Sequence, residues 1–201
     1  MKTPAFKEWD SVIRALGCGA SCLILRKGGI HEERRLFEIR HSSFLLFPTF
    51  EHQAAEDLQK DAGVFLQESL REARLTGRVC LRFEAVLERA WWVGDLAKIE
   101  AAHRLHAYSL QGARKKFEWG DRRPGVYALL VRVKRWVQPW DIAERSAYGG
   151  CRSWIGIEEV PSRMPPQPSV PVLEDARFGV RAAEAGKIFH GCEEICEGGT
   201  R

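Results

Sequence analysis

Apolar residues near the start of the chain recur at intervals of three and four positions. The set is Phe6, Trp9, Val12, Ile13 and Leu16. This spacing places the side chains on one face of a helix. Thr3 and Pro4 suit the cap and first turn of that helix, and Gly17 suits its end. The pattern therefore predicts a helix from Pro4 to Leu16.

Three short apolar runs follow, and each is typical of a β-strand. They are Ser21 to Arg26, Phe37 to Arg40 and Phe44 to Phe47. Gly28 and Gly29 come just after the first run, and a glycine pair permits the positive φ angles of a reversing turn. The simplest interpretation is an antiparallel meander.

Pro48 and Thr49 mark a change of structure after these runs. Proline has no N–H to donate, so Pro48 is expected to end the strand. Thr49 can accept a hydrogen bond from the free amides of a following helix. The segment from Phe50 to Leu75 can place apolar residues on one face and is predicted to be that helix, with Gly63 as a point of division.

The rest of the chain repeats these two patterns. Val79 to Leu87 alternates apolar and polar residues, as a half-buried strand does. Asp95 suits the cap of a helix from Leu96 to Leu110. Two further apolar runs, Val126 to Val133 and Trp154 to Val160, are predicted to be strands. The turns of the opening meander are too short for parallel crossovers, so the predicted fold class is α+β, with one mostly antiparallel, curved sheet flanked by helices.

Composition divides the chain into a domain and a tail. The 201 residues are 45% hydrophobic, which is enough for a real core. The longest apolar runs are shorter than a membrane span, and the N-terminus carries charges where a secretion signal needs apolar residues, so a cytoplasmic protein is expected. Residues 1–160 are predicted to form a single domain. Residues 161–201 are rich in Pro, Glu and Gly and are predicted to be a linker and a loosely ordered tail.

Charge is concentrated in one stretch, although the formal net charge of +4 is modest. Between Gln111 and Trp136 there are eight Lys or Arg residues against two acidic ones, with aromatic residues interleaved. Such a surface can neutralise phosphates and stack bases, and it favours a nucleic-acid or nucleotide partner. The alternative is a solvated basic turn before a core strand. Oligomeric state and protein partners are left open.

Four of the six cysteines form two pairs of the same spacing, Cys18 with Cys22 and Cys192 with Cys196. Without a secretory signal a disulfide framework is not expected, and one cysteine of the first pair lies in a predicted strand. We expect reduced thiols and no bound zinc. P-loop and dinucleotide-binding fingerprints are absent, so no cofactor is expected.

Reactive side chains gather at predicted turns and element ends. The candidate ligand-binding residues are Arg26, Lys27, His41, Thr49, His52, Gln53, Arg132, Tyr148, Cys151, Ser153 and Trp154. Side chains at element ends escape the sheet ladder, so most of this set is predicted to converge on one concave site for an anionic ligand. The alternative is three separate solvated turns.

Two functions fit this set, and a structural interaction protein is a third option. The first is a nucleic-acid or nucleotide-binding module that uses the set for phosphate contacts, base-edge bonding and stacking. The second is a hydrolase of nucleotides or nucleic acids, with His41 or His52 as general base and Arg26 or Lys27 stabilising the developing charge. A clustered acidic set for metal-dependent nuclease chemistry is not evident, so binding is favoured.

Four motifs in order, LRKGGI, FLLFPTFEHQ, ALLVRVKRW and YGGCRSW, resemble the bacterial family called domain of unknown function 1802, over about residues 5 to 160. Some relatives look fused to a restriction-endonuclease-like domain, which implies a DNA-processing or defence context. The order of elements is also similar to PUA-like barrels of the ASCH type. That likeness implies a barrel-like sheet and a protein that binds RNA or modified bases.

Overall fold

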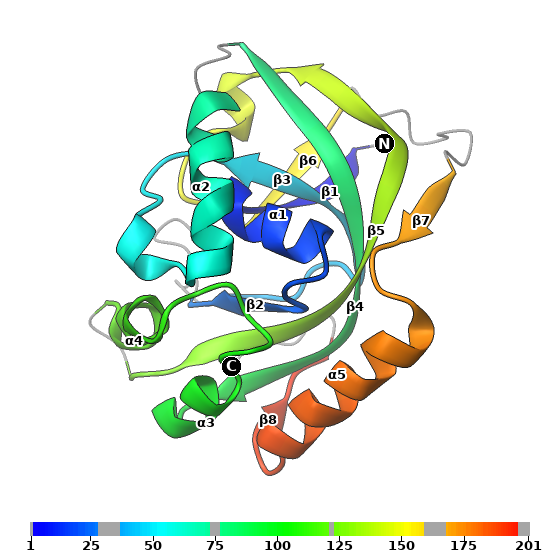
Figure 1. Cartoon of the computed structure of the whole chain (residues 1–201). Coiled ribbons are helices and arrows are strands. Elements are labelled where there is room, and N and C mark those ends of the chain that lie inside the picture. Colours follow the sequence, from blue (N-terminus) through cyan, green and yellow to red (C-terminus); the bar gives the residue numbers. More distant parts are fainter. Residues whose placement is uncertain (1, 28–36, 73–76, 121–122, 159–167, 197–201) are drawn as a thin grey trace.

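The computed structural model describes residues 2–27, 37–72, 77–120, 123–158 and 168–196. One curved sheet dominates it, with strands in the order β2, β5, β4, β3, β1, β6, while β7 pairs with β5 and β8 with β4 (Figure 1). The strands are β1 (Thr3–Trp9), β2 (Leu23–Arg26), β3 (Ser43–Thr49), β4 (Arg78–Val93), β5 (Val126–Ala143), β6 (Trp154–Ile157), β7 (Ser169–Pro171) and β8 (Glu193–Glu194).

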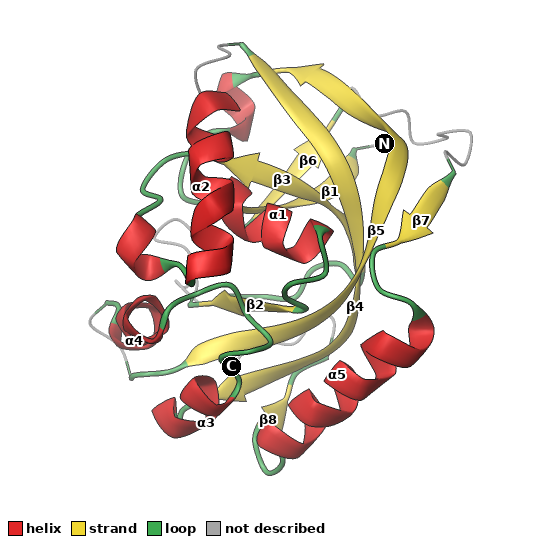
Figure 2. Cartoon of the chain, viewed as in Figure 1, coloured by secondary structure: helices red, strands yellow, loops and turns green. Residues whose placement is uncertain are grey.

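Helices flank this sheet (Figure 2). They are α1 (Asp10–Gly17), η2 (Ala55–Asp57), α2 (Lys60–Glu72), α3 (Leu96–Ala101), α4 (Leu110–Glu118), η3 (Ser146–Tyr148) and α5 (Asp175–Ile188). Among the described strands, only the pairing of β1 with β3 is parallel. The predicted fold class, α+β with a mostly antiparallel curved sheet, is confirmed.

The long strands β4 and β5 give the sheet its curvature. Their register shifts twice, between Leu81 and Phe83 and between Leu87 and Arg89. The first shift places three extra residues on β5, and the second places one extra residue on β4. Such irregularities bend the pair and increase its twist. One part of the β4–β5 hairpin therefore pairs with β2 at the edge of the sheet. Another part packs against β1, β3 and β6 through a second, smaller apolar cluster that includes Leu81, Trp136 and Ile155.

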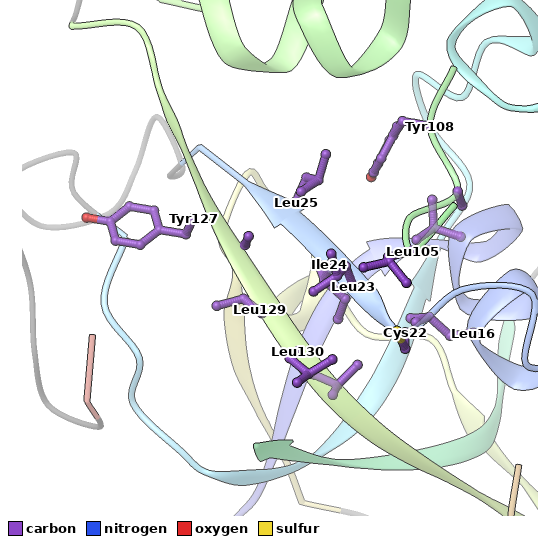
Figure 3. Close-up of a cluster of buried hydrophobic side chains, with 14 of the residues drawn as sticks. Leu16, Cys22, Leu23, Ile24, Leu25, Leu105, Tyr108, Tyr127, Leu129 and Leu130 are labelled. Carbon is purple, nitrogen blue, oxygen red and sulfur yellow. The ribbon is translucent and has the colours of Figure 1, made fainter. Parts of the chain in front are cut away.

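The larger apolar cluster lies between the sheet and helices α1, α4 and α5. Figure 3 shows part of it, where β2 and β5 meet the segment around Leu105. The side chains of Leu23, Ile24 and Leu25 in β2 are fully buried in this cluster. The backbone of β2 pairs with β5, and the Leu105 carbonyl accepts hydrogen bonds from Cys22 and Leu23. The apolar run predicted as a strand at Val126 to Val133 is the buried half of β5.

The predicted first helix is wrong over its first half. Thr3 to Trp9 is a central strand, and α1 begins at Asp10. β1 pairs with β3 along one edge and with β6 along the other. Phe6 packs in the larger apolar cluster and Ala5 in the smaller one, so Ala5 to Glu8 is buried on both faces. An element buried on both faces does not show the alternation of a half-buried strand, so the helical spacing of Phe6 and Trp9 was misleading.

The predicted meander is also wrong. β2 pairs with β5 and not with β3, so the first and third of the predicted runs are not neighbours. Phe37 to Arg40 forms no strand, although Phe37 and Ile39 are buried. The Gly28 and Gly29 turn lies outside the described residues. Long-range pairing therefore overrides the local hairpin signal.

Pro48 and Thr49 do not mark a helix start. Both belong to β3, and Thr49 Oγ1 donates a hydrogen bond to the Glu8 carbonyl at 3.0 Å instead of capping a helix. Pro48 lies beyond Leu45, the last β3 residue paired with β4, so its missing N–H costs no hydrogen bond on that side. The helix predicted from Phe50 begins only at Lys60.

The helix predicted from Leu96 to Leu110 is two helices. α3 ends at Ala101, and α4 begins at Leu110. Asp95 caps α3 as predicted, because its carboxylate accepts from the Ala97 N–H at 3.0 Å. The alternating run from Val79 to Leu87 lies within β4, also as predicted.

The predicted loose tail does not describe residues 168–196. Here β7, α5 and β8 pack on the sheet, and Phe178 and Phe189 are 3% and 1% exposed. Phe189 lies 5.1 Å from the ring of Trp91, centroid to centroid. The low density of large apolar residues in this segment was misleading, because Leu173, Phe178, Phe189 and Ile195 are all buried. No helix of the described residues is long and apolar enough to span a membrane.

Candidate functional site

Several strands begin or end together at one end of the sheet, and we use the word edge for this end. β1 and β3 are parallel and end together, with Trp9 opposite Thr49. β6 is antiparallel to β1 and therefore starts at the same edge, with Trp154 opposite Phe6 (Figure 1). Arg26, the last residue of β2, is held there by a side-chain hydrogen bond to Ser153. We call this edge the strand-end site.

Arg26 is fixed in the site by two contacts. Its Nε donates to Ser153 Oγ at 2.9 Å, and its guanidinium carbon lies 5.5 Å from the centre of the Phe6 ring. Ser153 is fully buried, and its carbonyl accepts the backbone N–H of Lys7 at 2.8 Å. The guanidinium is thus held against an apolar wall.

Trp154 joins His41 to the same site. The two rings are 5.3 Å apart in an edge-on arrangement, and Trp154 also packs 5.0 Å from Phe6. The indole Nε1 donates to the Glu38 carbonyl at 2.7 Å. The half-buried Trp154 is therefore part of the wall, and His41 lies exposed beside it.

Lys7 fixes the turn that carries Cys151. Its ammonium donates to the carbonyls of Tyr148 and Gly150 at 2.7 and 2.8 Å. Burial lowers the pKa of Lys7, and the charges of Arg152 and Arg26 lower it further. The lysine is thus a buried donor that holds the turn against β1 and leaves Cys151 exposed at its end.

Replacing Lys7 with Met is expected to loosen this turn. The two carbonyls would lose their buried donor, at a cost of about 1–3 kcal/mol of unfolding free energy. Urea denaturation measures that loss, and hydrogen exchange should show faster exchange in residues 148–153. Lys2→Met is the matched control, because Lys2 is an exposed residue of the same N-terminal segment. Unchanged exchange in the turn would contradict the assigned role of Lys7.

Glu8 is the acidic centre of the site. It is 2% exposed, and its Oε1 accepts from the Trp9 N–H at 2.9 Å and from the Tyr108 hydroxyl at 3.0 Å. Burial, followed by the charge of Glu8, raises the pKa of Tyr108 well above its usual value. The phenol therefore stays neutral and donates to the carboxylate.

Lys116 brings a third cation to the site. Its ammonium lies 4.5 Å from the ring centre of Tyr108 and 5.2 Å from that of Trp9. Burial lowers the pKa of Lys116; the charge of Glu8 opposes this shift, and that of Arg26 adds to it. Over the described residues, no carboxylate lies within ion-pair distance of Lys116, Arg26 or Arg152.

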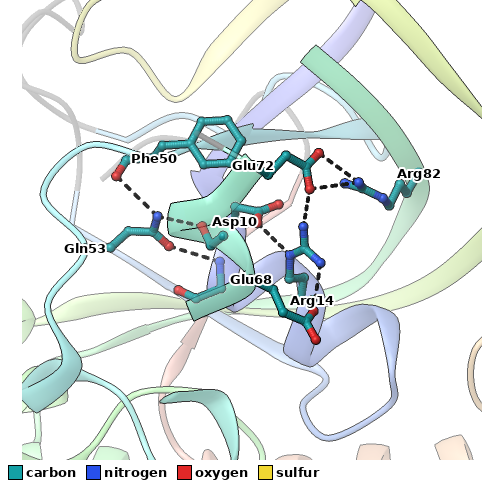
Figure 4. Close-up of polar contacts among 9 residues, drawn as sticks. Asp10, Arg14, Phe50, Gln53, Glu68, Glu72 and Arg82 are labelled. Atoms are coloured by element: carbon teal, nitrogen blue, oxygen red, sulfur yellow. Dashed lines mark hydrogen bonds and ion pairs between the residues drawn. The ribbon is translucent and has the colours of Figure 1, made fainter. Parts of the chain in front are cut away.

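Two of the predicted site residues have their side chains engaged elsewhere. Gln53 accepts from the Ser11 N–H and donates to Ser69 Oγ and to the Phe50 carbonyl, in the network between α1 and α2 (Figure 4). Arg132 pairs with Glu88 and Asp175 and packs on Phe178, so it anchors α5. For Gln53 and Arg132, contact with a shared ligand therefore stays a prediction, and both side chains have other partners in this structure.

Three other predicted residues lie beside the strand-end site or within it. Lys27 donates to the carbonyls of Phe117 and Arg123, at 2.7 and 3.3 Å, so it ties β2 to the end of α4. His52 is exposed, with a φ of 61°. Thr49 touches the Glu8 backbone and so belongs to the site.

The basic stretch is not the open cationic surface that its composition suggested. Arg114 pairs with Glu100 and Lys115 with Asp57, so acidic residues distant in sequence neutralise them. Of the interleaved aromatic residues, Phe117, Tyr127 and Trp136 are buried and Trp119 is exposed. The solvated alternative therefore describes Arg114 and Lys115, whereas Lys116 lies at the strand-end site.

A groove lies outside the strand-end site. This open groove of about 550 Å³ between α1, α2 and β4 is lined by Arg14, Glu68, Arg71, Glu72, Cys80, Arg82 and Asp141. Arg14 and Arg82 are paired with carboxylates, so the groove offers little unbalanced charge (Figure 4). No group of three or more His, Cys, Asp or Glu side chains in the described ranges is placed to hold a metal.

Five residues of the site were missed by sequence reasoning. They are Lys7, Glu8, Trp9, Tyr108 and Lys116. Only the first two carried a signal, since a charged pair between Phe6 and Trp9 is unusual in a buried element. Tyr108 and Lys116 reach the site through α4 and the segment before it. Lys116 belongs to the basic stretch noted in the sequence but was not assigned to this site, and nothing local marks Tyr108.

The fold and site together define an α+β protein in which cationic and aromatic side chains lie around a buried glutamate. The profile of Domain of unknown function (DUF1802) matches residues 5–184, and the chain belongs to this family. No curated protein matches the chain.

Solved structures of ASCH from Zymomonas mobilis are similar to this chain at a low level. The first has 13% identity and a TM-score of 0.40, and covers 90% of this chain and 94% of its own. A single-residue mutant of that protein has 16% identity and a TM-score of 0.42, and covers 96% of this chain and 100% of its own. At these values the likeness carries no conclusion about site or function.

Proposed function

We propose that this protein binds a nucleotide or a nucleic-acid strand at the strand-end site, with the phosphate between Arg26 and Lys116. One observation carries the proposal. Arg26 packs on the ring of Phe6 and Lys116 on the rings of Trp9 and Tyr108, and no carboxylate of the described residues forms an ion pair with either cation. Burial lowers the pKa of Lys116, the charge of Glu8 opposes this shift, and the charge of Arg26 adds to it. Like charges held together repel, and a bound phosphate would relieve that repulsion.

The surroundings of the two cations support the same ligand class. Lys116 is placed by the rings of Trp9 and Tyr108, and Arg26 by Ser153 and Phe6. Side chains positioned in advance lose less freedom when they bind a phosphate. The half-buried rings of Trp9 and Trp154 offer apolar surface beside the cations for a base. A DNA-processing or defence context, implied by the family resemblance, is part of this proposal.

The hydrolase alternative is not favoured by any particular contact. His41 and His52 are both exposed, and the contact of His41 that bears on the site is with the Trp154 ring. A general base needs a partner that orients it and a ligand within reach. Hydrolysis with either histidine as base stays a prediction.

A binding assay on a charge-deleted variant tests the proposal. Arg26→Gln with Lys116→Gln removes both cations and leaves a shorter, neutral polar side chain at each position. Each charge-assisted hydrogen bond to phosphate contributes about 1.5–3 kcal/mol, so binding of a fluorescent oligonucleotide is expected to weaken about 100-fold. Single-stranded RNA, single-stranded DNA and mononucleotides should compete, and wild-type affinity should fall as salt rises.

The matched control is Arg114→Gln with Lys115→Gln. It also removes two positive charges, from residues of α4 next to Lys116. These residues are already paired with Glu100 and Asp57. Its affinity should stay within about twofold of wild type, because only long-range attraction changes. Equal weakening of both double variants would show a diffuse charge effect and refute the site.

A further inference from the structure

Trp119 presents an aromatic ring that neither apolar cluster uses. All Phe, Tyr and Trp residues of the chain lie within the described ranges, and Trp119, at 50% exposure, is the only exposed one among them. Single aliphatic side chains are normal on a protein surface, whereas an exposed indole leaves a large, flat apolar face in solvent. The ring of Trp119 is therefore a surface that a ligand can reach.

Trp119 stands one helical turn beyond Lys116. It caps the C-terminal end of α4 with a φ of −59°, which is helical, so its Cβ continues the helix. Residues three apart on a helix are neighbours, with Cβ atoms about 5–6 Å apart. The ψ of 136° at Trp119 and the φ of 86° at Gly120 then turn the chain away from the helix axis. The indole and the ammonium of Lys116 therefore extend from the same side of α4.

The end of α4 is tied to the end of β2. Lys27 follows the last residue of β2, and its ammonium donates to the carbonyls of Phe117 and Arg123, at 2.7 and 3.3 Å. The Arg123 side chain is exposed, and no carboxylate of the described residues forms an ion pair with Lys27 or Arg123. Glu118 precedes Trp119 and lies about 100° away around the helix axis. The surface beside the indole is thus predominantly cationic.

We propose that Trp119 stacks on a base of a second nucleotide, so that the ligand of the strand-end site is a single nucleic-acid strand and not a mononucleotide. This rests on the proposed function, because it extends the same ligand beyond the phosphate held by Arg26 and Lys116. One turn of α4 is about 5.4 Å long, which is the rise of one to two nucleotides at about 3.4 Å each. Bases of a single strand have accessible faces, whereas a duplex covers them.

The mixture of one aromatic ring with cations favours a nucleic-acid strand over an apolar protein segment. A protein-binding face of that kind is a contiguous apolar patch, whereas the exposed side chains next to Trp119 in the described sequence are charged, as at Lys115 and Glu118. A single strand offers flat bases and a charged backbone together. Stacking tolerates any base, so Trp119 adds affinity and not sequence preference.

Binding of UMP and of a uridylate tetranucleotide to the same variants tests this inference. Trp119→Leu keeps an apolar side chain and removes the flat face, so it should weaken binding of the tetranucleotide about tenfold, as is typical for loss of one stacked base. Its affinity for UMP should stay within about twofold of wild type, because UMP occupies only the first position. Trp119→Phe keeps a ring and should retain tetranucleotide affinity within about threefold.

Leu110→Ala is the matched control, because Leu110 is an exposed apolar residue at the other end of α4. An unweakened tetranucleotide complex of Trp119→Leu, or an equal loss in Leu110→Ala, would overturn the inference. A wild-type protein that binds the tetranucleotide no more tightly than UMP would also overturn it and leave nucleotide binding intact, and this comparison requires no variant to fold. Failure of both probes to bind wild type would refute the proposed function itself, and this inference with it.

Discussion

A chain that ends before Pro168 is expected to lose its cooperative melting transition. The missing segment supplies the buried side chains Leu173, Phe178, Ala185, Phe189 and Ile195. Burying a large apolar side chain contributes about 1.5–3 kcal/mol, so the four large ones together approach the whole stability of a typical domain, about 5–15 kcal/mol. Removal would also expose Trp91, which packs on Phe189.

Circular dichroism during heating measures the effect. The control is a chain that ends after Cys196, which keeps β7, α5 and β8 and should melt like the full chain. Phe189→Ala gives an intermediate case, with an expected loss of about 3–5 kcal/mol because the ring is 1% exposed. A sharp, unshifted transition in the shortened chain would restore the boundary near residue 160 that composition suggested.

The fold class followed from the sequence because periodicity reports burial on one side of an element. Val79 to Leu87 alternates because one face of β4 meets the core and the other is more open. β1 is buried on both sides, so its run of Ala5 to Glu8 carries no such alternation. Strand partners were not predictable in the same way. β2 pairs with β5 across about a hundred residues, and a local turn signal contains no information about that contact.

The candidate site was predictable only where its residues stand at strand ends. Arg26, Ser153 and Trp154 were expected to converge, and the hydrogen bond from Arg26 to Ser153 brings them together. Arg132 and Gln53 were placed with them because basic and amide side chains look alike in sequence whether they meet a ligand or a neighbouring carboxylate. Their partners Asp175 and Ser11 lie 43 and 42 positions away. Sequence reasoning identified the edge of the sheet, and packing determined which side chains face it.

An ion-pair network centred on Arg14 leads to the second prediction, a large loss of stability when that arginine is replaced. Asp10 follows Glu8 and Trp9 in sequence, is 1% exposed, and accepts from Arg14 Nε at 2.6 Å. Arg14 also contacts Glu68 and Glu72, and Glu72 contacts Arg82, so the network joins α1, α2 and β4 (Figure 4). Burial raises the pKa of Asp10, whereas the hydrogen bond and the charge of Arg14 lower it.

Arg14→Met is therefore expected to lower the unfolding free energy by about 3–5 kcal/mol at neutral pH, since it leaves the Asp10 carboxylate buried and unpaired. Asp10→Asn in the same chain should recover part of that loss, and a urea double-mutant cycle measures the coupling. Arg71→Met is the control: Arg71 lines the same groove but is exposed, so it should cost at most about 0.5 kcal/mol.

The loss should also depend on pH, with a sign that the pKa of Asp10 fixes. Without Arg14, the folded-state pKa of Asp10 rises further above its unfolded value, so the folded state binds more protons between the two. Stability of Arg14→Met then falls as pH rises through that window, and the difference from wild type should shrink as pH is lowered toward 4. A difference that stays constant from pH 4 to pH 7, or that grows in acid, would show that the cost lies in lost packing of the arginine stem and not in the buried carboxylate.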